Sequence, residues 1–528
     1  MTTTPTTPTK PGFPAPRRYA ADAAYWEGAE RGILRYQACT ACGSAYFHPR
    51  PHCPSCGSRE TVWKDAAGTA TVYSFSIWRA ARRPTAVALV ELAEGPVIQT
   101  VIVDADLARL AIGEEVVVRF EPAEDGAPVP VFTTAAAERA RAYSARTAAE
   151  VTEVPGVDLA LARPVETVAV VGAGTMGTGI ATAYVAAGVP VILVDPDEAA
   201  LERAAGVLTE SLERAASRGR LTEAELLARR AGLTTSTQLA AVAPAGLVIE
   251  AVWEQRSLKE TVLEQLDRLV GPHAVLASNT STLDLDALAA ATSRPERVVG
   301  LHFFSPAHVM RLVEVVRGSR SSADALATAL ASVRAIGKTP VVVGNGPGFV
   351  GNRMMIARSA TARELLLEGS FPAQIDRVVR DLGLPMGPYE MFDLGGAIEL
   401  NHRRRQETGE EDWFVDELFR RGRLGQKTGA GYYSYPDGPR RPVADDELKA
   451  LVVEASQRAG VTRRRIDDAE IRDRLTEAML AAGRQLLAEG IALRAGDIDV
   501  VWREGFGWPT WKGGPMYDAE QRAAASRA

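Results

Sequence analysis

A histidine and a glutamate twelve residues apart form the chemically most suggestive pair in the sequence. His302 ends an apolar run, VVGLHFF, and Glu314 lies in a second run, LVEVV. The Pro-containing turn between the runs can reverse the chain and bring the two side chains face to face. A carboxylate beside an imidazole fixes its tautomer and stabilises its charged form, which suits a general base. From spacing alone, a packed histidine and a solvated glutamate are an equally good interpretation, and His308 is an equal rival.

A glycine loop precedes this pair in the sequence. The segment GAGTMG satisfies G-x-G-x-x-G between a strand, TVAVVG, and a helix, and Asp195 ends the next strand 23 residues after Gly172. This context predicts a dinucleotide site, with the phosphates at the helix N-terminus. An acid at that position accepts hydrogen bonds from a ribose and repels a 2′-phosphate, which favours NAD over NADP. The residues expected to contact the cofactor here are Gly172, Gly174, Thr175, Met176, Gly177 and Asp195.

All four cysteines lie within 18 residues, as CTACG and CPSCG. Cys39 and Cys42 form one C-x-x-C knuckle, and Cys53 and Cys56 form the other. Two such knuckles predict a tetrahedral, structural zinc site with four thiolate ligands. Either of two histidines between the knuckles is an alternative ligand. Two disulfides are the other alternative, but a reducing compartment and the strain of bridging within a knuckle disfavour them.

The elements around these residues predict a multidomain chain. Short strands with Gly and Pro turns after the knuckles predict a small OB-like barrel. Strands that alternate with helices after residue 165 predict an α/β Rossmann domain with a parallel sheet, and the chain becomes all-α near residue 347. The expected parts are a disordered tail (1–18), a helix and zinc ribbon (19–60), the barrel (61–135), a linker (136–164), the Rossmann domain (165–345), a helical substrate and dimerisation domain (346–436), a connector (437–470) and a second helical repeat (471–528).

The last part repeats an earlier one. Residues 474–515 parallel residues 352–388: in each, a helix ends in Glu-Gly, Ile-Asp opens the next helix, and G-x-P marks the exit. The sequence therefore predicts a duplicated helical unit whose second copy is truncated.

Length and charge limit the function further. A chain of 528 residues predicts three or four domains, and a net charge of −6 disfavours a protein that coats nucleic acid. Residues 1–150 hold 16 basic and 16 acidic side chains, so the barrel lacks the positive excess that phosphate binding needs. No apolar run long enough for a membrane span is present, and the first 18 residues lack the apolar core of a secretory signal. A cytoplasmic location is expected.

The N-terminal part resembles a known family. An aromatic helix, the two CxxCG knuckles and a small barrel, over roughly residues 19–135, resemble the zinc-ribbon/OB family often called DUF35. Members of that family commonly associate with thiolase-like and other acyl-CoA enzymes. The resemblance implies a docking or acyl-CoA-binding role for this part of the chain.

Residues 165–436 resemble the L-3-hydroxyacyl-CoA dehydrogenases. The motifs that carry the resemblance are VGAGTMGTGIA, EAVWEQRSLK, ASNTSTL, GLHFFSPAHVMRLVEVV, GPGFVGNR, LGLPMGPYEMFDLGG and KTGAGYYSY. The form HFFSPAHVM is similar to the dehydrogenase half of multifunctional β-oxidation enzymes. The roles implied by the resemblance are base (His302), its partner (Glu314), substrate contacts (Ser281, Asn352) and cofactor-side residues (Glu254, Lys259, Ser281).

The resemblance implies NAD-dependent oxidation of an (S)-3-hydroxyacyl-CoA to the 3-ketoacyl-CoA, or the reverse, within fatty-acid metabolism. Its expected partners are the acyl-CoA substrate, a thiolase or enoyl-CoA hydratase docked on the N-terminal module, and a second copy of the chain in a homodimer. The alternative is a catalytically weak acyl-CoA-binding scaffold for a thiolase or hydratase complex. The intact glycine loop and the pair of His302 and Glu314 favour an active enzyme.

Overall fold

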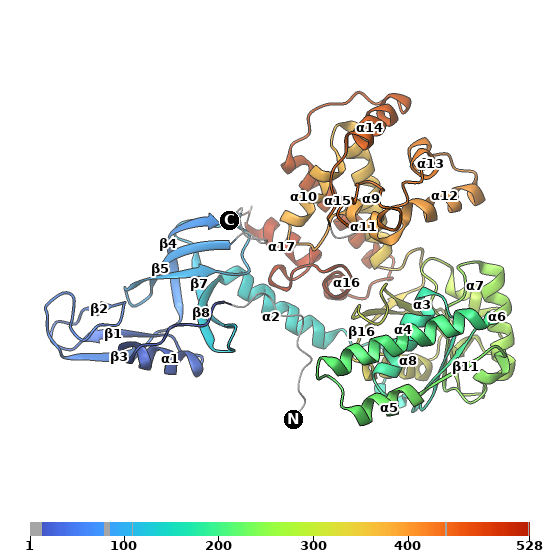
Figure 1. Cartoon of the computed structure of the whole chain (residues 1–528), viewed down its shortest axis with the longest axis horizontal. Coiled ribbons are helices and arrows are strands. Elements are labelled where there is room, and N and C mark those ends of the chain that lie inside the picture. Colours follow the sequence, from blue (N-terminus) through green and yellow to red (C-terminus); the bar gives the residue numbers. More distant parts are fainter. Residues whose placement is uncertain (1–12, 79–84, 108, 439–440, 526, 528) are drawn as a thin grey trace. The chain divides into compact units, whose positions relative to one another are not determined.

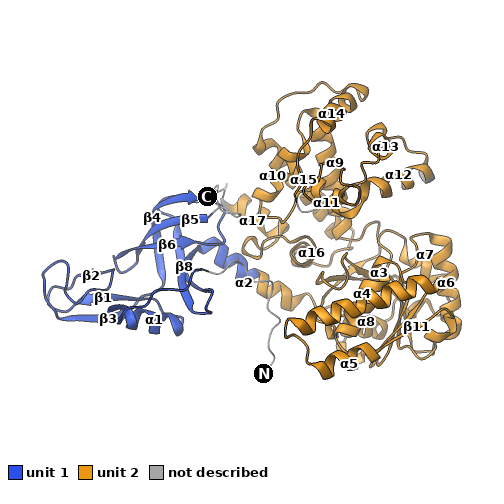
Figure 2. Cartoon of the chain, viewed as in Figure 1, with its two compact units in different colours: residues 1–143 blue, residues 144–528 orange. Residues whose placement is uncertain are grey.

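The computed structural model describes residues 13–78, 85–107, 109–438, 441–525 and 527. The chain forms two compact units, residues 1–143 and residues 144–528 (Figure 2). Of the tail expected over residues 1–18, residues 1–12 lie outside the described part. The remainder is paired: the carbonyl of Phe13 accepts a hydrogen bond from Glu124, 2.8 Å away, and Arg18 forms an ion pair with Glu30.

The first unit begins with a helix and a three-stranded antiparallel sheet of order β2-β1-β3. These elements are α1 (Ala23–Glu30), β1 (Arg35–Cys39), β2 (Ala45–Tyr46) and β3 (Thr61–Asp65). The expected barrel range included β3, but β3 pairs with β1 in this smaller sheet. The sheet positions the knuckles, because Cys39 is the last residue of β1.

Five further strands close into a barrel of order β4-β5-β6-β8-β7 (Figure 1). They are β4 (Thr69–Trp78), β5 (Thr85–Leu92), β6 (Val97–Ile102), β7 (Glu115–Pro122) and β8 (Pro128–Thr134). Along β5 every second residue from Ala86 to Leu92 is buried, and the residues between them face outward. This alternation lets side chains fill a small barrel. The prediction of an OB-like barrel is confirmed. The helix α2 (Ala135–Glu150) follows it.

The second unit contains an eight-stranded sheet of order β11-β10-β9-β12-β13-β14-β15-β16. The strands are β9 (Val168–Val171), β10 (Val191–Val194), β11 (Leu233–Ser236), β12 (Leu247–Glu250), β13 (Val275–Ser278), β14 (Val298–Phe303), β15 (Leu312–Arg317) and β16 (Thr339–Gly344). Strands β9 to β14 are parallel, whereas β15 runs antiparallel to β14. The strand order reverses direction between β9 and β12, which is the position where doubly wound sheets bind ligands.

Helices α3 to α8 accompany this sheet. They are α3 (Thr175–Ala186), α4 (Glu198–Ser217), α5 (Glu223–Ala231), α6 (Arg256–Leu269), α7 (Leu285–Ala289) and α8 (Ala323–Ala335). The strands at its centre are buried over their whole length, as expected for a parallel sheet that helices cover on both faces. The Rossmann prediction is confirmed.

The rest of the unit is helical. Its helices are α9 (Gly351–Glu368), α10 (Pro372–Asp381), α11 (Pro388–Gly395), α12 (Ala397–Thr408), α13 (Trp413–Arg420), α14 (Asp446–Arg458), α15 (Asp468–Ala488), α16 (Ala495–Phe506) and α17 (Pro515–Ala525). In the described part of the chain, no helix is long and apolar enough to cross a membrane.

The duplicated unit is visible in two buried aspartates. Asp376 in α10 accepts hydrogen bonds from the backbone N–H groups at the start of α11. Asp499 in α16 accepts the equivalent bonds from the start of α17. In both copies, the aspartate of the Ile-Asp pair thus satisfies N–H groups that a helix start leaves without partners.

The two copies also pair with each other. Helix α9 packs along α15 (Figure 1), while α10 contacts α15 and α16 contacts α9. Gly383 of the first copy faces Pro509 of the second, and Gly507 faces Pro385. Such reciprocal contacts are typical of a twofold arrangement, here formed within one chain.

Candidate active site

The structure brings His302 and Glu314 together. They stand directly opposite each other on the antiparallel strands β14 and β15, and Nδ1 of His302 lies 2.7 Å from Oε2 of Glu314. His302 is 6% exposed and Glu314 is fully buried. A proton on Nδ1 that faces the carboxylate leaves Nε2 as the acceptor, and within the described residues no group hydrogen-bonds Nε2. The imidazole therefore keeps one nitrogen free for a substrate proton.

The other carboxylate oxygen of Glu314 is held by the helical region. Its Oε1 accepts hydrogen bonds from the backbone N–H groups of Val350, at 3.1 Å, and Gly351, at 2.8 Å. These groups lie at the start of α9, where the helix dipole favours a negative charge. Every oxygen of the buried carboxylate thus has a partner, and the start of α9 fixes its position against His302.

The glycine loop has the shape that a dinucleotide requires. Gly172 follows β9 with φ at +106°, and a Cβ on Gly177 would lie 1.8 Å from the carbonyl oxygen of Gly172. A Cβ on Gly174, which caps α3, would meet only open space, so the backbone there is accessible to a phosphate. Oδ2 of Asp195 accepts a hydrogen bond from the N–H of Ala173, 2.7 Å away. Thr175 and Met176 form the first turn of α3. The loop, the acid and the helix start fit NAD.

A buried lysine organises the neighbouring loop. Nζ of Lys259 lies 2.7 Å from Oε1 of Glu250, 3.2 Å from Oε2 of Glu254 and 3.3 Å from the carbonyl oxygen of Val252. All three protons of the ammonium group thus have protein acceptors, and Lys259 is 1% exposed. These contacts favour a role in holding Glu254. Sequence analysis missed Glu250, because an acid that ends an apolar strand gives no sign of its burial.

Glu254 links the lysine to the loop after β13. Its Oε1 accepts hydrogen bonds from the hydroxyl of Thr280, at 2.7 Å, and from the N–H of Ser281, at 2.8 Å. Burial raises the pKa of Glu254, but the charge of Lys259 and these hydrogen bonds more than offset it and lower the pKa below its ordinary value. The Ser281 hydroxyl lies 3.2 Å from the same oxygen.

The two predicted substrate contacts come from different elements. Asn352 directly follows Gly351 in the first turn of α9, and Ser281 follows β13. No hydrogen bond within the described residues joins either side chain to His302. Asn279, which sequence analysis did not single out, accepts a hydrogen bond from the N–H of Phe303, 2.9 Å away, and so ties the loop after β13 to the end of β14. The SNTS motif that contains it was the available signal.

The four cysteines fit a zinc ion. Their sulfur atoms all lie within 4.8 Å of one another, with 3.7 Å from Cys39 to Cys56 and 3.7 Å from Cys42 to Cys53. Zinc–sulfur bonds of about 2.3 Å in a tetrahedron give sulfur separations of about 3.8 Å. A disulfide would need about 2.05 Å, so the two-disulfide alternative does not describe this geometry. Four thiolates would close the site and give it a structural role.

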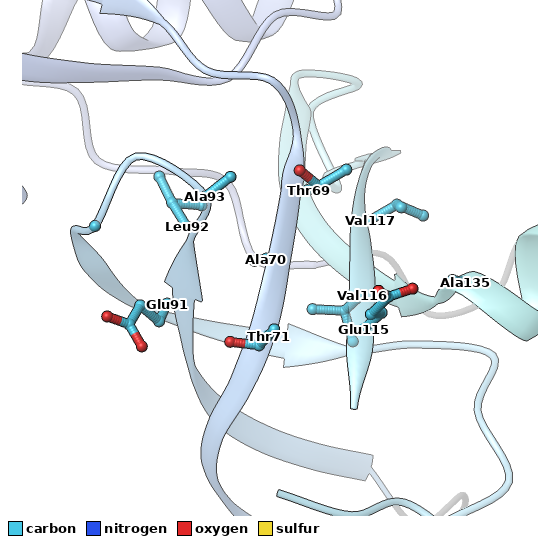
Figure 3. Close-up of a pocket in the computed structure, with 11 residues that line it drawn as sticks. Thr69, Ala70, Thr71, Glu91, Leu92, Ala93, Glu115, Val116, Val117 and Ala135 are labelled. Carbon is cyan, nitrogen blue, oxygen red and sulfur yellow. The ribbon is translucent and has the colours of Figure 1, made fainter. Parts of the chain in front are cut away.

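The barrel of the first unit has a hollow of about 480 Å³ lined by residues of β4, β5 and β7 (Figure 3). Thr71 of β4 stands between Glu91 of β5 and Glu115 of β7, because both glutamates are its cross-strand partners. Two exposed carboxylates at this place repel phosphate groups. The hollow is therefore a poor site for the phosphates of coenzyme A.

A doubly wound sheet with a glycine loop at its switch point is the fold that binds dinucleotides, and the histidine–carboxylate pair lies at the same edge of this sheet. Residues 167–346 match the family model "3-hydroxyacyl-CoA dehydrogenase, NAD binding domain", and residues 348–435 match "3-hydroxyacyl-CoA dehydrogenase, C-terminal domain". Together the two matches span more than half of the sequence. The chain belongs to the 3-hydroxyacyl-CoA dehydrogenase family.

The N-terminal unit matches two further models. Residues 26–62 match "ChsH2, rubredoxin-like zinc ribbon domain", and residues 63–121 match "ChsH2, C-terminal OB-fold domain". The zinc-ribbon and OB predictions are both confirmed by these matches.

Known relatives match about two thirds of the chain. The "Peroxisomal bifunctional enzyme" of Danio rerio is 40% identical over 376 residues, which are 68% of this chain and 52% of that protein. The structure of 3-hydroxybutyryl-CoA dehydrogenase from Escherichia coli K12 is 28% identical with a TM-score of 0.57, over 68% of this chain and 92% of that one. The dehydrogenase part of multifunctional enzyme 1 from C. elegans is 29% identical with a TM-score of 0.52, over 71% and 87%. The chain spans about half the length of the curated relatives it matches.

Proposed function

We propose that the chain interconverts (S)-3-hydroxyacyl-CoA and 3-ketoacyl-CoA with NAD. The observation that carries this proposal is the buried contact of 2.7 Å between Nδ1 of His302 and Glu314, on the sheet edge that also carries the glycine loop. Alcohol oxidation needs a base for the hydroxyl proton, and this imidazole has its second nitrogen free. The family membership supplies the acyl-CoA class of the substrate.

In the oxidation, Nε2 of His302 removes the proton of the 3-hydroxyl group while the hydrogen on C3 leaves as hydride. Bound NAD supplies the acceptor for that hydride. Glu314 holds the Nδ1 proton and stabilises the imidazolium that forms. In the reduction, the same imidazolium returns the proton to the developing alkoxide, so His302 acts as the acid.

Ser281 and Asn352 are proposed to orient the substrate. Both are polar, half-buried residues, Ser281 in the loop after β13 and Asn352 in the first turn of α9, and a hydroxyl and an amide can hydrogen-bond the reacting oxygen or the thioester carbonyl. Glu254 and Lys259 are proposed to hold the loop that carries Ser281 and to form the cofactor side of the site.

A panel of 3-ketoacyl-CoAs from C4 to C16 tests this function through the loss of NADH absorbance. We expect turnover for at least one chain length, and oxidation of the (S) but not the (R) isomer of the matching 3-hydroxyacyl-CoA. Tight NADH binding without turnover at any length would contradict the proposal and favour the acyl-CoA-binding scaffold.

The N-terminal unit is proposed to dock an acyl-CoA enzyme, either a thiolase or an enoyl-CoA hydratase. The outer face of β4, β5 and β6 supports this, because it exposes large apolar side chains. They are Tyr73, Trp78, Val87, Leu89 and Val97. We expect full-length protein with Leu89→Asp to lose binding to a purified thiolase or hydratase that binds the parent protein. Equal binding by the variant and the parent protein would reject this face as the docking surface, and a parent protein that binds neither enzyme would reject the docking role itself.

The homodimer remains a prediction. Within this chain, α9 of the expected dimerisation domain already packs against α15 of the second repeat. That internal pairing counts against dimerisation through the same helices. Light scattering of the full chain distinguishes a monomer from a dimer. A cytoplasmic location also stays a prediction.

A further inference from the structure

Phe506, the last residue of α16, brings an aromatic ring from the second helical repeat to the dyad. Its ring meets that of Phe304 edge to face, with centroids 5.6 Å apart. Phe304 in turn lies 4.5 Å from the imidazole of His302, which it follows by two positions. One aromatic ring therefore separates the second repeat from the proposed base.

The ring of Phe506 is rigidly mounted. It stacks on the fully buried Trp502 at 4.4 Å and 24°, and the indole N–H of Trp502 points to the sulfur of Met354, 3.1 Å away. A Cβ on Gly351 would lie 2.9 Å from a ring carbon of Phe506, so that glycine makes room for the ring. The N–H of Gly351 is one of the two that hold Glu314. The end of α16, the start of α9 and the dyad thus form one packed cluster.

The duplicated unit supplies a direct comparison. Leu382 precedes Gly383 in the first repeat as Phe506 precedes Gly507 in the second, and the two glycines make the reciprocal contacts between the repeats. Leu382 is 8% exposed and belongs to the helical core, whereas Phe506 is half-buried beside the dyad. The same position therefore carries a core leucine in one copy and a partly open aromatic ring in the other.

The strand order indicates which side of the dyad this ring faces. The glycine loop adjoins β9 and β12, and β13 separates them from β14. Phe506 lies on the other flank, because α16 packs against β15 and β16. The cofactor approaches His302 from the side of β12, so the flank that Phe304 and Phe506 cover is left for the substrate.

We propose that Phe506 is a specificity-determining residue which forms, with Phe304, an apolar wall for the acyl carbons beyond the reacting carbon. This inference rests on the proposed function and adds a contribution of the second repeat to the same site. Acyl carbon atoms that pack on the wall are removed from water, which is favourable. The wall therefore increases the affinity for longer acyl chains relative to short ones.

The test compares Phe506→Ala with Leu382→Ala, its positional twin. For each variant kcat and KM are measured with C4 and C10 3-ketoacyl-CoA. In Phe506→Ala we expect the C10-to-C4 ratio of kcat/KM to fall about tenfold, mainly through KM for C10. Leu382→Ala should leave the ratio at the parent value even where it lowers the unfolding temperature. An unchanged ratio in Phe506→Ala, or the same change in both variants, would overturn the proposal.

A second experiment measures ligand binding instead of turnover, in case Phe506→Ala folds poorly. It also distinguishes a failure of the apolar wall from a failure of the proposed function. Phe506→Leu introduces the residue type that stands at the equivalent position, Leu382, in the first repeat. Its binding of butyryl-CoA and decanoyl-CoA is measured by calorimetry, which requires no turnover. We expect Phe506→Leu to weaken the binding of decanoyl-CoA more than the binding of butyryl-CoA. Parent protein that binds both ligands without turning over any 3-ketoacyl-CoA would refute the proposed function alone. Parent turnover together with an unchanged binding ratio in Phe506→Leu would refute the wall alone.

Discussion

The Rossmann domain contains two buried pairs of a basic and an acidic side chain, His302 with Glu314 and Lys259 with Glu250. The pairs differ in the hydrogen-bonding groups that they leave unused. All three ammonium protons of Lys259 face protein oxygens. The imidazole of His302 uses one nitrogen on Glu314 and keeps the other. A buried pair whose hydrogen-bonding capacity is exhausted can only hold structure, whereas one with a spare nitrogen can exchange a proton with a ligand.

The pairs differ also in what supports their carboxylates. Glu250 is held from its own sheet, by the hydroxyl of Ser278 at 2.6 Å and the N–H of Val252 at 2.8 Å. Glu314 is held by the start of α9, in the helical half of the unit. The lysine pair therefore depends on the sheet and on α6, which packs on it, and the histidine pair depends on how the helical half packs on the sheet.

The largest expected effect of a single change follows Glu314→Gln. The glutamine oxygen would stay on the two backbone N–H groups of α9, so its NH₂ group would face Nδ1. That contact requires the proton on Nε2, the tautomer that cannot accept a substrate proton. We expect kcat to fall roughly 10³-fold with nearly unchanged NADH affinity, measured by NADH absorbance and fluorescence.

Asp416→Asn is the matched control for this change. Oδ1 of Asp416 lies 2.7 Å from Nδ1 of His402 in the helical region. The same type of histidine–carboxylate contact therefore occurs outside the proposed active site. The variant Asp416→Asn should leave kcat near the parent value. Parent-like turnover in Glu314→Gln, or an equal loss in the control, would break the distinction between a proton-exchanging pair and a structural one.

Lys259→Met should affect stability more than chemistry. It leaves the buried Glu250 without its cation, and breaking a buried pair typically costs about 3–5 kcal/mol. We expect the unfolding temperature to fall by roughly 5–10 °C and NADH to bind more weakly, because Glu254 loses its support. Circular dichroism with and without NADH measures both effects.

Lys449→Met removes a comparable contact of 2.7 Å with Asp446, but on the surface. Such pairs contribute little, so its unfolding temperature should barely change. Equal shifts of the unfolding temperature in the two lysine variants would show that the buried Lys259 pair stabilises the fold no more than a surface pair does.

The smallest effect concerns the acid dependence of Glu254. Its pKa lies below the ordinary value near 4.5, so its charged form stabilises the fold above that pH. The contribution is lost as the pH falls through the lowered pKa. The difference in unfolding free energy between the parent and Glu254→Gln should therefore shrink between about pH 5 and pH 3. Denaturant titrations at several pH values measure it; a difference that grows toward acid would reverse the assigned sign.

The sequence was most informative where a local pattern sets local geometry. The two knuckles, the glycine loop and the alternation of the barrel strands depend on near neighbours, and each predicted its structure. His302 and Glu314 are joined by a short reversal, so the spacing allowed their meeting, but only the family resemblance favoured it over a solvated glutamate. The motif EAVWEQRSLK pointed to Glu254 and Lys259, but nothing in it indicated that Lys259 contacts the buried Glu250 at its start.

Contacts between distant segments could not be predicted in this way. Phe506 reaches the dyad from about 200 residues further along the chain, and its position depends on how α16 packs against α9 and β15. The two backbone amides that hold Glu314 belong to a helix start whose location only the folded domains define. A repeat in the sequence indicates a second copy of the helical unit, but it does not indicate which copy contacts the proposed active site.

The proposed reaction depends most on the imidazole of His302, which exchanges the substrate proton. Its most direct test is His302→Ala, assayed for turnover of acetoacetyl-CoA with NADH and for NADH affinity in the same preparation. We predict a fall in kcat on the order of 10³-fold with NADH affinity almost unchanged. Parent-like turnover, or a loss of NADH binding in proportion to the loss of turnover, would contradict it.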